Sequence, residues 1–82
     1  MKTILYFTAS WCGPCKALAP RMVKLADQIN YRKIDVDSNQ DLSMKYGVRN
    51  VPSLVLVDEN GTELNRIVGV QPDEAILNLY NG

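Results

Sequence analysis

The sequence contains no histidine and only two cysteines, and this shortage narrows the chemistry open to the chain. A structural zinc site takes four ligands, mostly from cysteine and histidine. We therefore expect no metal centre in a single copy of the chain. Only a dimer or a shared iron–sulfur cluster would bring enough ligands together. The two cysteines are better suited to redox chemistry.

An excess of either charge is also missing, because nine basic residues balance nine acidic ones. A nucleic-acid binder that works through phosphate contacts needs a basic excess. We therefore expect no nucleic-acid partner, and expect partners to be recognised through shape and apolar contact.

Long hydrophobic runs are absent as well. The N-terminal apolar run ends at Thr8, well short of a signal-peptide core or a membrane span. We expect a soluble, cytoplasmic protein without a membrane partner. The 82 residues, free of repeats and linkers, predict one domain over 1–82.

The most informative feature present is the segment Trp11-Cys12-Gly13-Pro14-Cys15, which follows an apolar run and opens a helix-patterned stretch. Two cysteines three apart at a helix start can close a small disulfide, and the helix N-terminus favours a thiolate on the first. We predict a dithiol redox site. Cys12 is expected to stay accessible and act as the nucleophile, while Cys15 is partly covered and resolves the mixed disulfide.

The pattern of apolar residues and turn signals predicts the element order β-α-β-α-β-β-α. Strands are expected over 3–8, 31–36, 53–57 and 64–68. A first helix carries an apolar stripe as far as Ile29 and bends at Pro20. A strand–helix–strand start implies a parallel crossover, and the later hairpin adds an antiparallel pair. The predicted fold class is α/β, with a mixed four-stranded sheet flanked by helices.

Three local signals complete this prediction. Asp37 or Ser38 is expected to cap a short second helix, which carries Leu42 and Tyr46 on its inner face and closes at Gly47. The Asn60-Gly61 pair is expected to supply the positive φ angles of a hairpin. Pro72 is expected at the first position of a last helix, which turns Ile76, Leu77 and Tyr80 inward.

With these features in order, the chain resembles the thioredoxin family nearly from end to end. The resemblance rests on Trp11 to Lys16, Pro20, Lys33 to Asp37, Lys45 to Arg49, Val51-Pro52-Ser53 and Val68-Gly69. It implies a minimal thioredoxin fold, similar in length to glutaredoxins and to short archaeal and phage thioredoxins. It also implies a protein-disulfide reductase that serves as an electron carrier. Such a protein binds no cofactor itself and is recharged by a thioredoxin reductase, commonly a flavoprotein that draws on NADPH. We expect a monomer.

The resemblance further implies a substrate groove lined by Trp11, Val51, Pro52 and Gly69, with a cis Val51–Pro52 bond. An extended substrate would pair with the backbone of Val51 in the manner of strand addition. Gly13 and Pro14 would set the reach of the redox loop. Taken alone, Trp11 could be a core aromatic, Pro52 an ordinary turn proline and Gly69 a bulge.

Two positions depart from the family pattern. The family usually buries an aspartate six residues before the first cysteine, where this chain has Tyr6, and its second tryptophan is replaced by Thr8. Lys33 consequently lacks its usual partner and is expected to be a solvated strand lysine. Because a neutral tyrosine is a poor base, our hypothesis is that water or the leaving thiolate of Cys12 deprotonates Cys15. The rate–pH profile would then lack a carboxylate inflection.

The sequence leaves two alternative functions open. A glutathione-linked, glutaredoxin-like protein fits the short length, but Cys12-Gly13-Pro14-Cys15 lacks the proline after the first cysteine that glutaredoxins typically carry. The second is a redox-independent binding or processivity subunit, which would retain its function without either cysteine.

Overall fold

The computed structural model describes residues 1–82 and contains four strands and three helices in the predicted order. The elements in chain order are β1 (Thr3–Thr8), α1 (Gly13–Leu25), β2 (Tyr31–Asp35), α2 (Gln40–Lys45), β3 (Ser53–Val57), β4 (Glu63–Val68) and α3 (Asp73–Asn81).

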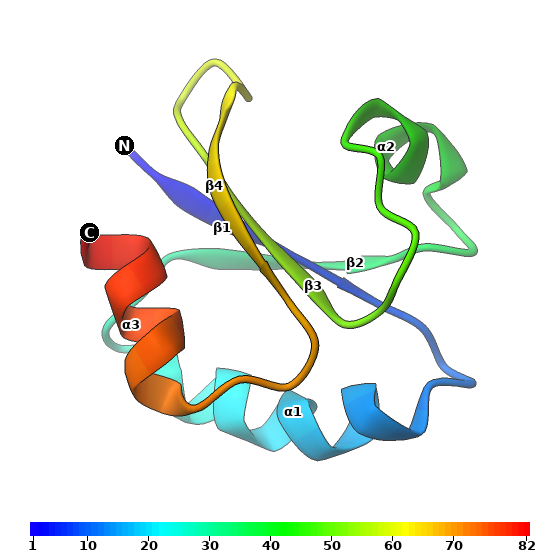
Figure 1. Ribbon diagram of the computed structural model, residues 1–82, viewed down its shortest axis with the longest axis horizontal. Coiled ribbons are helices and arrows are strands. Elements are labelled where there is room, and N and C mark those ends of the chain that lie inside the picture. The colour runs from blue at the N-terminus through cyan, green and yellow to red at the C-terminus, as the bar shows by residue number, and fades with distance from the viewer.

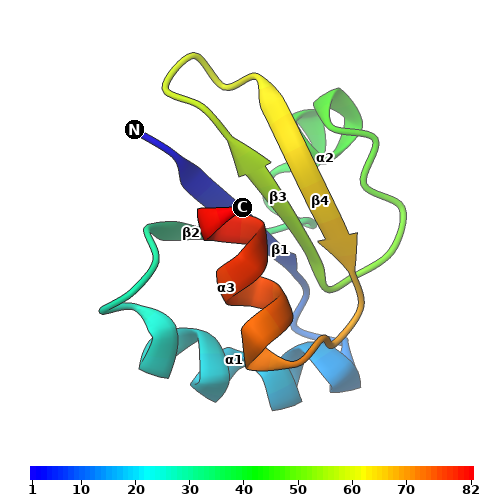
Figure 2. The same cartoon turned by 60° about the vertical axis from the view of Figure 1, so that its left-hand side comes forward.

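The four strands form one mixed sheet in the order β2-β1-β3-β4. β1 runs parallel to β2 and antiparallel to β3, and β4 is antiparallel to β3. Figures 1 and 2 show α1 and α3 together on one side of this sheet and α2 on the other. The predicted fold class is therefore confirmed. The redox segment follows the C-terminal end of β1, a central strand buried from Ile4 to Thr8.

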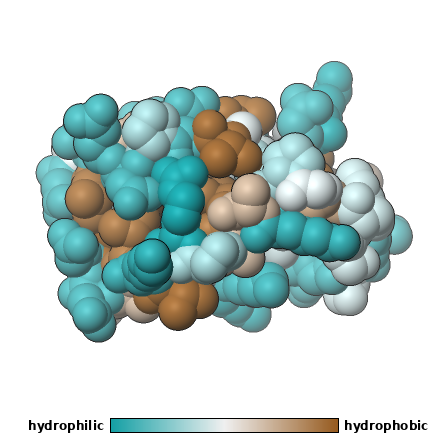
Figure 3. Space-filling model, turned by 90° about the horizontal axis from the view of Figure 1, so that it is seen from below, coloured by the Kyte–Doolittle hydropathy of each residue, from teal (hydrophilic) through white to brown (hydrophobic).

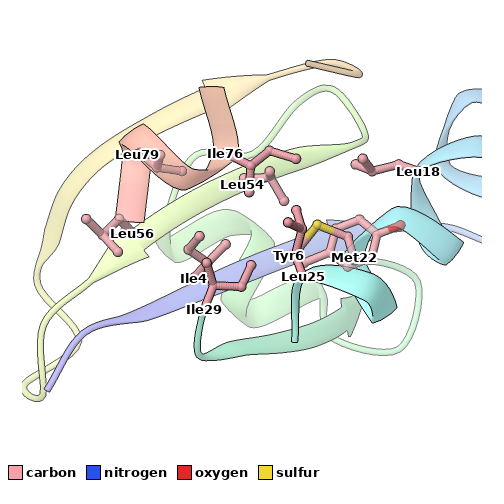
Figure 4. Packing of buried hydrophobic residues seen from close by; sticks show 10 residues of the cluster. All are labelled: Ile4, Tyr6, Leu18, Met22, Leu25, Ile29, Leu54, Leu56, Ile76 and Leu79. Atoms are coloured by element: carbon pink, nitrogen blue, oxygen red, sulfur yellow. The ribbon is translucent and has the colours of Figure 1, made fainter. Parts of the chain in front are cut away.

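Successive side chains of the two central strands point to opposite faces of the sheet, so the core is divided between those two faces. Ile4 and Tyr6 of β1 face α1 and α3, and Figure 4 shows them among apolar side chains from those helices. Leu5 and Phe7 face the opposite way and pack with Tyr46, next to α2. Each face of β1 is thus covered, which explains its unbroken apolar sequence.

The first helix is shorter than its apolar stripe predicted. α1 ends at Leu25, whose carbonyl oxygen accepts the N–H groups of both Gln28 and Ile29. Ile29 is buried with the same core cluster, but from the turn after the helix. The Asn30 side chain donates hydrogen bonds to Lys2 O and Thr3 Oγ1, so contacts with β1 set where the chain leaves the helix. Pro20 does lie inside α1, as predicted.

The predicted cap of the second helix was wrong. Asn39, not Asp37 or Ser38, precedes α2, and its side chain makes no capping hydrogen bond. The Asp35 side chain accepts the N–H of Asp37 at 2.8 Å, and the Asp35 carbonyl accepts that of Ser38 at 3.2 Å. These hydrogen bonds hold Asp37 and Ser38 in a turn, so α2 begins only at Gln40. Gly47, with a φ of 61°, follows the helix end as expected.

The hairpin and last helix also differ in detail. Only Gly61 of the Asn60-Gly61 pair has a positive φ, since the loop closes through a bond from the N–H of Asp58 to Thr62 O. Pro72 occupies the N-cap position of α3 and not its first helical position. On α3 the fully buried residues are Ile76 and Leu79, whereas the expected Leu77 and Tyr80 are only partly buried.

Seen from the α1 side, the surface is mainly hydrophilic, and its hydrophobic residues lie in separate patches (Figure 3). No helix combines the length and apolar character that crossing a bilayer requires. The N- and C-terminal segments lie near one another (Figures 1 and 2), and the hydroxyl of Tyr80 is 3.5 Å from Lys2 O.

Candidate redox site

The redox segment bridges the end of β1 and the start of α1. Cys12 is the N-cap of the helix, with extended backbone angles, and Cys15 lies in its first turn. The two residues form a disulfide, with their Cα atoms 5.2 Å apart. The backbone N–H of Cys15 points at Cys12 Sγ over 3.1 Å. One of the unpaired N–H groups of the helix start is therefore directed at the first sulfur, where it stabilises negative charge.

Both cysteines are buried in this oxidised form, so the expectation that Cys12 stays accessible was wrong for this state. Cys12 is 4% exposed and Cys15 is 2% exposed. Cys12 Sγ lies 3.6 Å from the carbonyl oxygen of Val51, and both cysteines pack with Ala9. The disulfide thus sits under the Val51 segment, although Gly13 and Pro14 of its loop are exposed.

Trp11 is an exposed residue rather than a core aromatic, with 67% of its surface accessible. Its indole Nε1–H donates to Asp37 Oδ2 at 2.9 Å. This bond joins the redox loop to the turn after β2. Asp37 therefore positions the tryptophan, a role that its place in the sequence after a strand did not reveal.

A shallow hollow of about 270 Å³ lies between Trp11 and the segment before β3, with Val36, Val48, Arg49, Asn50 and Val51 as its other walls. The peptide bond between Val51 and Pro52 is cis, as expected. Val51 is half-buried, and its backbone N–H donates no hydrogen bond within the protein. The hollow therefore offers an apolar wall beside a free backbone donor.

Of the four expected groove residues, Trp11 and Val51 share this hollow, whereas Pro52 and Gly69 do not line it. The Pro52 side chain is buried. Gly69 lies next to it, because its N–H donates to Pro52 O at 2.8 Å. Gly69 has a φ of 87°, and an added Cβ would meet nothing within 4 Å. The space above Gly69 is thus open, while its backbone favours glycine.

The two residues that depart from the family pattern, Tyr6 and Thr8, lie on the face of the sheet that α1 covers. Tyr6 is buried, and its hydroxyl donates to the carbonyl oxygen of Cys15 at 3.2 Å. Thr8 is buried at the end of β1. Lys33 is exposed, as expected for a solvated strand lysine. Nowhere do three or more histidine, cysteine, aspartate or glutamate residues gather as metal ligands would.

Comparisons with known proteins agree on one family. The family model "Thioredoxin" matches residues 1–81. The thioredoxin of Bacillus subtilis is 44% identical over 79 residues, which cover 92% of this chain and 75% of that protein. The thioredoxin of Mycoplasma genitalium is 38% identical over 81 residues, covering 95% of this chain and 78% of that protein.

Solved structures give the same result. A single-site variant of the thioredoxin from Halobacterium salinarum superposes with a TM-score of 0.88 at 43% identity, covering 98% of this chain and 72% of that one. The thioredoxin of Fasciola hepatica superposes with a TM-score of 0.86 at 30% identity, covering 98% and 79%. With these matches and the Cys12–Cys15 disulfide at the start of α1, the chain belongs to the thioredoxin family and is a thiol–disulfide oxidoreductase that reduces protein disulfides.

Proposed function

We propose that Cys12 attacks the substrate disulfide and that Cys15 then resolves the mixed disulfide. The observation that carries this assignment is the N–H of Cys15, which points at Cys12 Sγ from the first turn of α1. That contact, together with the helix dipole, lowers the free energy of a thiolate on Cys12. Cys15 Sγ receives no such hydrogen bond within the protein, so the geometry favours Cys12 as the attacking thiolate.

The proposed reaction proceeds by two thiol–disulfide exchanges. The Cys12 thiolate attacks one substrate sulfur, forms a mixed disulfide and releases the other substrate sulfur as a thiolate. Cys15 loses its proton and attacks Cys12 Sγ, which closes the Cys12–Cys15 disulfide and releases the second substrate thiolate. Gly13 and Pro14 keep the two sulfurs within reach of each other.

We propose that the substrate chain lies across the Trp11 hollow and pairs with Val51. The free N–H of Val51 and the open space beside Gly69 both support an extended peptide at this edge. Backbone pairing of this kind gives affinity with little side-chain selection. Pro52, being buried, would hold the Val51 backbone in place rather than touch the substrate through its ring.

The remaining steps of the cycle are also proposals. A thioredoxin reductase, drawing electrons from NADPH through a flavin, would reduce the Cys12–Cys15 disulfide, so that the protein acts as an electron carrier. We place this cycle in the cytoplasm, where dithiols are kept reduced. Residues 1–82 would act as one domain and as a monomer, because the redox pair and the Trp11 hollow are both built within one copy.

The test is insulin disulfide reduction with NADPH and a panel of thioredoxin reductases, run beside a glutathione and glutathione-reductase arm. We expect turnover with a thioredoxin reductase and its loss in Cys12→Ser. The Cys15→Ser variant should instead accumulate a mixed disulfide with the substrate. Turnover only with glutathione would replace the proposal by the glutaredoxin-like alternative. Absence of turnover in both arms would favour a redox-independent binding subunit.

A further inference from the structure

A second pocket lies behind the redox disulfide, on the side of the sheet that α1 covers. We call it the rear pocket. It has a volume of about 270 Å³ and is lined by Thr8, Ala9, Ser10, Cys15, Lys16, Ala19, Lys33 and Asp35. Cys15, the proposed resolving cysteine, thus shares a cavity with an acidic residue, two lysines and two hydroxyl groups.

The register of the sheet explains how these groups meet. In the parallel pair of β1 and β2, Tyr6 lies opposite Lys33 and Thr8 lies opposite Asp35. Because side chains two residues apart share a face, all four point toward α1. Tyr6 is large and reaches the helix. Thr8 is small where the family usually has a tryptophan, so the space above it is left open next to Asp35.

The Asp35 carboxylate is available as a base. One of its oxygens, Oδ1, accepts the backbone N–H of Asp37 at 2.8 Å. Its other oxygen, Oδ2, has no hydrogen-bond partner in the protein and no ion pair. Asp35 is half-buried and stands on the wall of the rear pocket. A carboxylate with a free oxygen, at a pocket that also has hydroxyl and ammonium groups in its walls, can take a proton through water.

We propose that Asp35 accepts the proton of Cys15 through water held in the rear pocket. This inference rests on the proposed role of Cys15 as the resolving thiol. The S–H proton passes to water and from water to Asp35 Oδ2. The Cys15 thiolate attacks Cys12 Sγ, the bond between Cys12 and the substrate sulfur breaks, and the substrate leaves as a thiolate. The Asp35 carboxylic acid then returns its proton to solvent.

Two lysines are the other charged groups around this route. Lys16 comes from α1 and Lys33 from β2, and both line the rear pocket with Asp35. Positive charges near a thiol stabilise the thiolate, so both lysines favour loss of the Cys15 proton, although they also make a nearby carboxylate a weaker base. Tyr6 donates its hydroxyl to Cys15 O and so does not compete as a base. The hypothesis that water or the Cys12 thiolate alone takes the proton predicts no carboxylate inflection in the rate–pH profile, so that profile distinguishes the two routes.

The substitution Asp35→Asn isolates the proton-accepting role. An asparagine side chain keeps an Oδ1 that can accept the Asp37 N–H, so the turn after β2 is retained, but it cannot bind a proton near neutral pH. Asp27→Asn is the matched control, because Asp27 is exposed beyond the end of α1 and its loss changes the net charge equally.

The experiment is a stopped-flow reaction of the fully reduced protein with dithionitrobenzoate, followed through the coloured thiolate. Attack by Cys12 releases the first equivalent and resolution by Cys15 releases the second. We expect Asp35→Asn to slow the second phase about tenfold, which is less than the roughly 100-fold or more that a directly positioned base contributes, because water relays the proton. It should also remove an acidic inflection, in which the wild-type rate of this phase falls with falling pH.

The first phase serves as the internal control for folding and for the proposed function. We expect it to be unchanged in Asp35→Asn and Asp27→Asn. A second phase in Asp35→Asn with the wild-type rate and pH profile would overturn the assignment of Asp35 while leaving the proposed function intact. Loss of the first phase in Cys15→Ser rather than in Cys12→Ser would instead overturn the proposed roles of the cysteines.

Discussion

At the scale of single residues, Tyr6 shows how a substitution within a family can exchange a chemical role for a structural one. Its ring fills the core between β1 and α1, and its hydroxyl reaches the carbonyl oxygen of Cys15. The absence of a carboxylate at this position could be read from the sequence. The hydrogen bond from Tyr6 to Cys15 could not, because it depends on the distance between α1 and the sheet.

The Tyr6 hydroxyl is expected to contribute to stability. Tyr6→Phe keeps the ring and removes the buried hydrogen bond, so the free energy of unfolding should fall by about 1 kcal/mol. Urea unfolding of the oxidised protein, monitored by far-UV circular dichroism, measures this loss. Tyr31→Phe is the comparison, because the hydroxyl of Tyr31 makes no hydrogen bond within the protein and its removal should cost almost nothing. Equal losses in both variants would refute the role given to the Tyr6 bond.

Asp37 is expected to act on substrate binding through Trp11. Asp37→Ala removes the acceptor that holds the indole, whereas Asp37→Asn keeps an oxygen in the same place. An exposed hydrogen bond of about 1 kcal/mol corresponds to roughly a fivefold change in affinity. We therefore expect Asp37→Ala to raise KM for insulin by roughly that factor with little change in kcat. Asp37→Asn should stay close to wild type, and a fall in kcat instead of a rise in KM would contradict this role.

At the scale of elements, the strands and their order followed from sequence because each depends on a short run of residues. β1 and β3 are continuous apolar runs between turn signals, and both were predicted with the bounds observed. β2 and β4 each differ from the predicted range by one residue at one end, and the larger errors lie at helix ends, where tertiary contacts determine the boundary. Ile29 continues the apolar stripe of α1, yet the helix ends before it. The side chain of Asn30 donates hydrogen bonds to Lys2 O and Thr3 Oγ1, which fixes the chain near the start of β1.

The features of the redox site also differ in whether they depend on a short run of residues or on tertiary contacts. Cys12 and Cys15 are only three residues apart in sequence, so their pairing could be predicted from spacing. The Trp11–Asp37 bond and the rear pocket bring together residues from β1, α1 and the end of β2. Only the register of β1 against β2 places Asp35 opposite Thr8, and register was not visible in the sequence.

The edge strand β4 carries an ion pair with a pH-dependent effect. Arg66 donates to both oxygens of Glu63 and, through Nη2, to Tyr46 O, which ties β4 to the end of α2. The hydrogen bonds from Arg66 lower the pKa of Glu63 and raise that of Arg66. A carboxyl whose pKa is lowered on folding stabilises the folded state above its unfolded pKa, and this stabilisation is lost as pH falls through the folded pKa.

Glu63→Gln should therefore lower the free energy of unfolding near pH 7 by at most about 1 kcal/mol, since the pair is close to the surface. As the pH falls below the ordinary glutamate pKa of about 4.3 and on through the lowered pKa of Glu63 in the folded protein, the difference between the two proteins should shrink toward zero. Urea titrations of both proteins across this range provide the measurement. A difference that grows as the solution is acidified would have the wrong sign for this ion pair.

At the scale of the whole molecule, the redox state and the stability of the fold are linked through the Cys12–Cys15 disulfide. Folding and disulfide formation are two equilibria of one thermodynamic cycle. The free energy by which the disulfide stabilises the folded state therefore equals the free energy by which folding favours formation of the disulfide. The two cysteines are three residues apart, so the disulfide closes a very short loop. In the chain-entropy model a loop of this size contributes about 2 kcal/mol.

We expect the oxidised protein to exceed the reduced protein in free energy of unfolding by about 2 kcal/mol, measured by urea titration with and without a reductant. By the same cycle, the disulfide should form roughly 30-fold more favourably in the folded chain than in the unfolded one. Cys12→Ser, which cannot close the loop, should unfold identically under both conditions. A reduced wild type as stable as the oxidised form would mean that the folded reduced state gains compensating contacts, with the Cys12 thiolate bound at the start of α1 as the first place to look.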